Sequence, residues 1–166
     1  MTGAADPLLS LEQFIPYRLN RAAEMVSRRF AAIYRRHSGL TRPEWRALAT
    51  LGQYGSLTAT DIGRHSAMHK TKVSRAVQAL EDRRWLKRQT DSDDRRVEHL
   101  TLTALGQKNY RALARLALDF EMRLRETLGA ELFDQLNAGM EAVEAAYDAN
   151  RAPDKQKPAA LRSPAS

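Results

Sequence analysis

The chain has 166 residues, a formal net charge of +7 at pH 7 and no cysteine. Its length fits one globular domain, and the lack of cysteine excludes disulfides, thiolate catalysis and cysteine-ligated metal sites. No apolar run reaches the ~20 residues that cross a bilayer. Residues 1–7 lack the basic and apolar segments of a signal peptide. We therefore expect a cytoplasmic protein with no membrane partner.

The positive charge is unevenly distributed along the chain. Residues 60–90 carry 8 basic and 3 acidic side chains, whereas residues 100–150 carry 5 basic and 8 acidic ones. A concentrated positive surface favours an anionic partner such as a nucleic acid. On charge alone, an arginine-rich solvated surface is an equal alternative.

A long helix is predicted near the N-terminus. Ser10 begins a segment with the spacing of a capping box, and apolar residues follow at helical spacing. The ring of Pro16 would clash with the carbonyl group four residues earlier in a continuous helix. We therefore expect a short turn over residues 11–15 and a long helix over residues 16–37, which Gly39 ends.

Three shorter helices are expected next. Thr41 has the spacing of a capping box before a helix over residues 42–54, and Thr58 has it before a helix over residues 59–66. A further helix is predicted over residues 70–83. The three-residue link between the last two helices is typical of a helix-turn-helix.

The pattern then changes to that of a β-hairpin. Residues 85–90 and 97–102 are predicted strands, and the second of them alternates apolar and polar residues with a period of two. Residues 91–96 between them contain no apolar side chain and are expected to form a turn.

Two long amphipathic helices follow the hairpin. Thr103 is expected to cap a helix over residues 104–128, and a final helix is predicted over residues 131–149. Residues 151–166 contain three prolines and no apolar pattern, so we expect an unfolded tail.

The sequence contains no arrangement of residues that is typical of an enzyme. It lacks a glycine-rich phosphate loop and a Gly-x-Ser-x-Gly elbow. The histidines do not have the spacing of zinc ligands; they are His37, His65, His69 and His99. We therefore expect no enzymatic activity, no catalytic residue, no metal site and no cofactor.

The order of elements predicts a mainly α fold with a small β-hairpin wing, which is a winged helix-turn-helix. The segment after the predicted recognition helix follows the pattern D-x-R, three residues, then L-x-L-T-x-x-G. The residues that match it are Asp94, Arg96, Leu100, Leu102, Thr103 and Gly106. This pattern resembles the signature of the MarR (multiple antibiotic resistance regulator) family, and the resemblance covers about residues 10–150. Arg84 stands where the family usually has glycine, so the sequence does not determine the backbone conformation at this position.

The resemblance implies a homodimer that binds double-stranded DNA. Residues 1–40 would contribute an N-terminal helix to the dimerisation region, and residues 41–103 would form the winged helix-turn-helix DNA-binding domain. Residues 104–150 would provide C-terminal dimerisation helices. The alternative is that the flanking helices fold back on their own domain.

Two groups of residues are candidates for DNA contact. The first lies at the start of the recognition helix and comprises Lys70, Thr71, Lys72, Ser74 and Arg75. These side chains can bind base edges or phosphates, although an ordinary solvated helix start is the alternative. The second is Arg95 and Arg96 at the wing tip, where Arg96 matches the family arginine that enters the minor groove. The resemblance implies that Asp94 orients that arginine through a salt bridge; the alternative is a turn-former, and the two roles are compatible.

The family resemblance also implies a small effector. Relatives commonly bind small aromatic acids between the dimerisation helices and the DNA-binding lobe. Residues of the first two helices could line such a cleft: Tyr17, Arg18, Arg21, Tyr34, His37, Trp45 and Arg46. For Tyr34 and Trp45, a place in the core is the favoured interpretation.

The sequence therefore predicts a transcription factor, and specifically a repressor that a small effector releases from a pseudo-palindromic operator. The alternative is an architectural or partner-recruiting DNA-binding protein without an effector.

Overall fold

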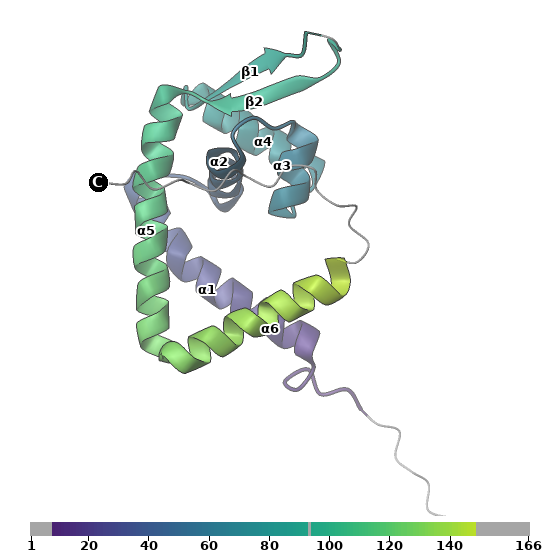
Figure 1. Cartoon of the computed structure of the whole chain (residues 1–166), viewed down its shortest axis with the longest axis vertical. Helices are drawn as coiled ribbons and strands as arrows, with labels where there is room; N and C mark the ends of the chain where they lie inside the picture. Colours follow the sequence, from purple (N-terminus) through teal and green to yellow (C-terminus); the bar gives the residue numbers. More distant parts are fainter. Residues whose placement is uncertain (1–7, 93, 149–166) are drawn as a thin grey trace, which may run out of the picture.

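The structure is a computed structural model that describes residues 8–92 and 94–148 (Figure 1). The predicted tail at 151–166 lies outside the described residues. The helices are α1 (Ile15–Ser38), α2 (Arg42–Tyr54), α3 (Ala59–Ser66), α4 (Lys70–Asp82), α5 (Ala104–Leu128) and α6 (Ala130–Asp148). The strands are β1 (Leu86–Thr90) and β2 (Glu98–Leu102), and they form one antiparallel hairpin. The mainly α fold with a β-hairpin wing is therefore confirmed.

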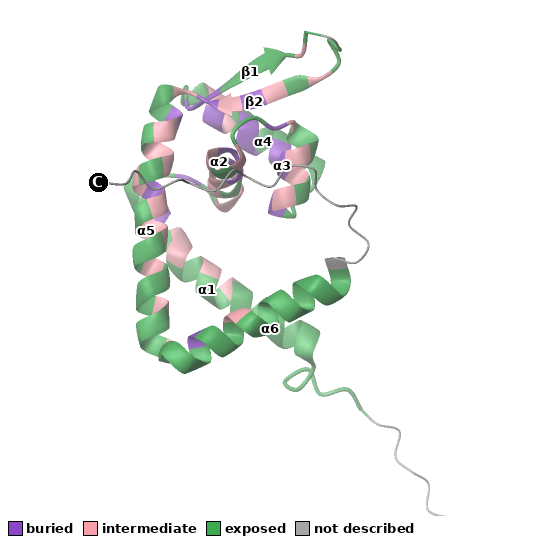
Figure 2. Cartoon of the chain, in the orientation of Figure 1, coloured by how far each residue is buried: buried purple, intermediate pink, exposed green. Residues whose placement is uncertain are grey.

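The elements form two lobes that α5 connects (Figure 1). The winged-helix lobe consists of α2, α3, α4 and the hairpin, and it holds most of the buried residues (Figure 2). The helical lobe consists of α1, α6 and the C-terminal half of α5. The fully buried side chains of the winged-helix lobe include Leu48, Leu51, Ile62, Val73, Val77, Leu80 and Leu100.

The start of α1 differs from the sequence-based expectation. The Ser10 hydroxyl donates a hydrogen bond to the Glu12 carboxylate at 3.2 Å, so it caps no helix. The helix begins at Ile15 with Phe14 as its N-cap and with Pro16 in its first turn. Proline fits there because the first amides of a helix have no intrahelical partner. Gly39 ends α1 in the left-handed conformation (φ 66°), as expected.

Local capping explains why the next helices begin where the sequence predicts. The Thr41 backbone amide donates to the Glu44 carboxylate at 3.0 Å. At α3, the Asp61 amide donates to the Thr58 hydroxyl at 3.2 Å, and the Thr58 amide donates to the Asp61 carboxylate at 3.2 Å. The Thr58 hydroxyl also donates to this carboxylate, which lowers the pKa of Asp61.

The end of α4 shows the backbone conformation of Arg84, which stands where the family pattern has glycine. Arg84 adopts a left-handed conformation with φ 61°. Its amide donates to the Glu81 carbonyl at 2.7 Å, and the Trp85 amide donates to the Leu80 carbonyl at 2.9 Å. These two bonds form a Schellman motif, which normally places glycine at the left-handed position. Arg84 therefore adopts the left-handed conformation of this motif at a steric cost.

Relief of this cost gives a first prediction. Arg84→Gly should raise the free energy of unfolding by about 0.5–1 kcal/mol, because glycine adopts positive φ without a Cβ clash. Urea unfolding with an unchanged m-value would measure the gain. Arg84→Ala is the control, since alanine removes the guanidinium but keeps the Cβ. A gain of equal size in Arg84→Ala would contradict the backbone explanation.

The hairpin is fixed to the lobe near its base, where β2 bridges to the segment before α3. Leu86 pairs with Leu102 and Thr90 with Glu98, and a further bridge joins Leu100 to Leu57 in front of α3. Each strand begins one residue later than predicted. Trp85 belongs to the Schellman motif, and Val97 belongs to the turn, because its amide donates to the Asp94 carbonyl at 2.9 Å.

The Thr-x-x-Gly part of the sequence pattern has a structural explanation. The Thr103 hydroxyl donates to the Arg84 carbonyl at 2.7 Å and accepts from the Gly106 amide at 3.1 Å. A Cβ at Gly106 would collide with the Trp85 carbonyl group. The start of α5 is thereby packed directly onto the end of α4.

Candidate nucleic-acid interface

The recognition helix α4 separates its side chains into two faces. Val73, Ala76, Val77 and Leu80 are buried against the lobe. The predicted contact residues lie on the opposite, exposed face and in the first turns: Lys70, Thr71, Lys72, Ser74 and Arg75. The structure therefore brings the first group of predicted DNA-contact residues together on one surface. This surface carries three cations and two hydroxyls.

A hollow of about 560 Å³ lies beside this surface, between α3, α4 and β1. Met68, Val73 and Val77 supply its apolar walls, while Lys70 and Arg88 contribute cations. The outer face of the lobe is therefore concave next to α4.

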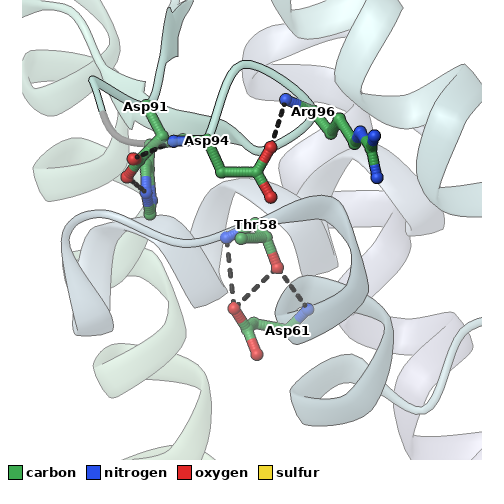
Figure 3. A network of polar contacts seen from close by, with 6 residues as sticks. Thr58, Asp61, Asp91, Asp94 and Arg96 are labelled. Atoms are coloured by element: carbon green, nitrogen blue, oxygen red, sulfur yellow. Dashed lines mark hydrogen bonds and ion pairs between the residues drawn. The ribbon is translucent and has the colours of Figure 1, made fainter.

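The wing turn is held by a chain of side-chain to backbone bonds (Figure 3). The Asp94 amide donates to the Asp91 carboxylate at 3.1 Å, and the Arg96 amide donates to the Asp94 carboxylate at 2.9 Å. The other Asp91 oxygen lies 2.9 Å from Nε2 of His99 in β2. The turn is thus anchored to the second strand.

The contact of Asp94 corrects the sequence-based expectation of a salt bridge. Its carboxylate accepts from the backbone of Arg96, and the guanidinium of Arg96 points away from it (Figure 3). An aspartate readily bonds the amide two residues further on, which is an Asx-turn. The turn-forming alternative is therefore the one that the geometry supports. Any influence of Asp94 on the Arg96 side chain acts through the backbone.

Arg95 and Arg96 are exposed and share a second hollow with the start of α3. This hollow of about 560 Å³ is lined by Thr58, Ala59, Thr60, Arg95, Arg96, Val97 and Glu98. The two guanidinium groups can attract a phosphate. The start of α3 is already capped by the Asp61 carboxylate and Glu98 lines the same hollow, so Arg95 and Arg96 supply its anion-binding character.

The wing is also fixed relative to α4 through Arg88. The Arg88 guanidinium donates to Glu81 of α4 at 2.9 Å and to Glu98 of β2 at 3.1 Å. The hydrogen bond that Arg88 donates to Glu81 contributes most to raising the pKa of Arg88. Sequence analysis did not identify this residue, since its two partners lie in other elements and no local pattern signals them.

The predicted ligand residues are not brought together within one chain. Tyr17, Arg18 and Arg21 are exposed near the start of α1, whereas His37 lies near its end, about 30 Å away along a helix of this length. Arg46 is exposed on α2.

Tyr34 is buried in the core, as favoured by the sequence, and Trp45 is partly buried and packs against that core. Their rings stack with centroids 5.8 Å apart, and Phe30 contacts both rings edge-on at 5.3 Å. Burial raises the pKa of the Tyr34 hydroxyl.

His37 does line an open pocket between α1 and α5. The pocket has a volume of about 570 Å³ and is lined by Ala32, Ile33, Arg36, His37 and Leu116. Sequence analysis did not include Arg36, because nothing in the helical pattern separates it from the other exposed arginines of α1.

The described segments contain no group of three histidine, aspartate or glutamate residues that could hold a metal ion. Within the same segments, no helix is long and apolar enough to cross a membrane.

Comparisons with known proteins agree with this geometry. The family model that describes the MarR family matches residues 38–97. A MarR family transcriptional regulator from Silicibacter pomeroyi is 26% identical with a TM-score of 0.68, and the match covers 81% of this chain and 98% of that one. A comparison with the curated proteins found no match.

Two other solved structures share the fold. The transcriptional repressor CouR, bound to a 23-mer DNA duplex, is 25% identical with a TM-score of 0.72, and the match covers 84% of this chain and 99% of CouR. NadR in complex with 4-hydroxyphenylacetate is 24% identical with a TM-score of 0.68, and the match covers 83% of this chain and 97% of NadR.

The fold and the exposed α4 and wing define a winged helix-turn-helix protein. Residues 38–97 match the MarR family model, and the chain as a whole is similar in fold to MarR family transcriptional regulators.

Proposed function

We propose that the protein is a transcriptional repressor that binds a pseudo-palindromic DNA operator as a homodimer and is released by a small effector. The observation that carries the proposal is that the start of α4 and the wing tip both present exposed basic side chains on the winged-helix lobe. CouR, which has the same fold and was solved on a DNA duplex, supports the same choice of partner. The proposal assigns no enzymatic activity and no cofactor to the chain.

The start of α4 and the wing tip would contact different parts of the DNA. The start of α4 enters the major groove, where Lys70, Thr71, Lys72, Ser74 and Arg75 can reach base edges and phosphates. The wing follows the adjacent backbone, and Arg96 extends into the minor groove. The Arg88 ion pairs keep these two contacts in a fixed relation.

Arg75 gives a direct test of sequence reading. Selection from a random pool of DNA duplexes would first supply the preferred duplex. Arg75→Ala should then lower affinity for it by about 1–3 kcal/mol and relax specificity at one position, while affinity for scrambled duplex changes little. Fluorescence anisotropy at one fixed salt concentration would measure both affinities. Arg115→Ala on α5 is the control, because it removes the same charge from an exposed site remote from α4. Equal losses on both duplexes would reassign Arg75 to a phosphate.

The helical lobe supports the proposed homodimer. Its exposed faces carry large apolar side chains along both α1 and α6, and α6 is almost entirely exposed (Figure 2). Ile15 and Leu19 of α1 line an apolar groove of about 360 Å³ together with Leu136, Met140 and Val143 of α6. These α6 residues are each 44% exposed. An apolar surface of this extent is expected to be covered, and a second copy presents the same surface.

The proposed effector is a small aromatic acid. The α1–α5 pocket combines apolar walls with two groups, Arg36 and His37, that can bind a carboxylate. NadR, which shares the fold, was solved with 4-hydroxyphenylacetate. Titration of the DNA complex with 4-hydroxyphenylacetate and salicylate at constant salt should release the DNA, while the neutral 4-hydroxyphenylacetamide should not.

Arg36→Ala should abolish this response and leave DNA binding without effector intact. If no aromatic acid changes the affinity for DNA, the alternative of an architectural protein without an effector is favoured instead.

A further inference from the structure

Arg83 connects the end of the recognition helix to the end of α1. Its guanidinium donates to the Ser38 carbonyl at 2.9 Å and to the Gly39 carbonyl at 3.1 Å. The Arg83 and Ser38 positions are separated by 45 residues in the sequence. The side chain therefore bridges the winged-helix lobe and the helical lobe.

The contact uses properties that only arginine has. The last carbonyl groups of a helix lack intrahelical partners, and a cation is favourable beside them because of the helix dipole. The planar guanidinium can serve two carbonyl oxygens at once, whereas an ammonium is a point charge without this fork. Arg83 thus caps α1 from a different element.

Two further groups restrict the orientation of the Arg83 side chain. Its guanidinium carbon lies 5.5 Å from the centre of the Trp85 ring, within the range of a cation–π contact. The carboxylate of Glu44, near the start of α2, lies 3.9 Å away. The side chain is still 36% exposed, so these contacts orient the guanidinium without burying it.

Other contacts hold α1 without involving the recognition helix. Glu24 of α1 forms an ion pair with Arg42, the first residue of α2, at 2.6 Å. Neither residue belongs to α4. Arg83, in contrast, follows the last residue of α4 directly, so its bonds join the end of α1 to the end of the recognition helix.

We propose that Arg83 is a positioning residue that sets the angle between α1 and α4 and so fixes the separation of the two recognition helices in the dimer. This inference rests on the proposed homodimer. A dimer reads two half-sites correctly only when its recognition helices have the matching separation. Arg83 acts on DNA binding from the end of α4 that is remote from the base-reading residues, and it touches no base.

A distance measurement between the two recognition helices tests the proposal without DNA. Because the chain has no cysteine, Gln78→Cys on the exposed side of α4 introduces a single spin-label site per protomer. Pulsed electron paramagnetic resonance then gives the distance distribution between the two labels. We expect a distribution at least about twofold broader in Arg83→Ala, and an intermediate one in Arg83→Lys, as the two lobes sample more orientations.

A second experiment measures DNA affinity. It uses the duplex selected by the wild-type protein and two altered duplexes, in which the half-sites are one base pair further apart or closer together. Arg83→Ala should bind the original duplex about tenfold more weakly, as expected for the loss of two partly exposed charge-assisted bonds. Discrimination against the altered spacings should shrink. Arg84→Ala is the control, since it removes the neighbouring guanidinium and leaves the contacts of Arg83 in place.

The outcomes separate this inference from the proposed function. If the distance distribution or the spacing preference is unchanged in Arg83→Ala, the positioning role is wrong. A wild-type protein that is monomeric, or that selects no duplex, overturns the proposed function and with it the role of Arg83. Thermal unfolding of each variant identifies a simple loss of folding, and Arg83→Lys, which keeps the charge, then provides the comparison.

Discussion

Replacement of both Leu136 and Met140 with aspartate is expected to convert the dimer into monomers that bind the selected duplex at least about a hundredfold more weakly. The dimer would bury four unpaired carboxylates, two from each protomer, in an apolar interface, which costs several kcal/mol. A monomer also makes the phosphate and base contacts of only one half-site. Sedimentation velocity measures the association state, and anisotropy on the same samples measures the affinity.

The control for this variant places the same charges on the other side of α6. Ala138 and Ala145 are exposed and lie roughly 180–200° around the helix from Leu136, at 100° per residue. The double replacement of these alanines with aspartate should leave the dimer intact. A dimer that persists in the Leu136 and Met140 variant would show that this face of α6 is not the interface.

The second large effect is expected at the wing. Arg96→Ala should weaken binding to the selected duplex about tenfold to a hundredfold, and Arg96→Lys should recover only part of the loss. The guanidinium is planar and weakly hydrated, so it sheds water in a narrow groove more easily than an ammonium does. A contact with phosphate alone would be restored almost fully by lysine, and that result would contradict the minor-groove role.

Asp94 variants test how Arg96 is positioned. Asp94→Ala should cost less than Arg96→Ala, and the double variant should resemble Arg96→Ala alone, because both changes act on one contact. Asp94→Asn should bind nearly as well as wild type, since the amide oxygen can still accept from the Arg96 backbone. A loss as large as that of Asp94→Ala would instead point to a salt bridge. Additive losses in the double variant would show that Asp94 does not position Arg96.

Features that depend on neighbours in the sequence were predicted well. The caps at Thr41, Thr58 and Thr103 act within three residues, so their spacing alone locates the helix starts. Ser10 has the same spacing, but Pro16 shifts the start of α1 beyond its reach. The left-handed position of Arg84 could be anticipated because the family pattern has glycine there.

Features that depend on distant residues were missed. The partners of Arg83 and Arg88 lie in other elements, so no periodicity distinguishes these two arginines from exposed ones. For Asp94 the sequence identified the correct neighbour, but it could not show whether the backbone or the guanidinium of Arg96 is bound. The candidate ligand residues were grouped by residue type, and the length of α1 separates Tyr17 from His37.

The proposed function requires sequence-specific DNA binding by a two-fold dimer. Hydroxyl-radical footprinting of the full chain on its selected duplex tests this most directly. We expect two protected blocks related by a two-fold axis, with centres about one helical turn apart, and protected minor-groove sugars at the positions of the two wings. Arg96→Ala should remove the minor-groove protection and leave the rest. A single protected block, or uniform protection without sequence preference, would contradict the account.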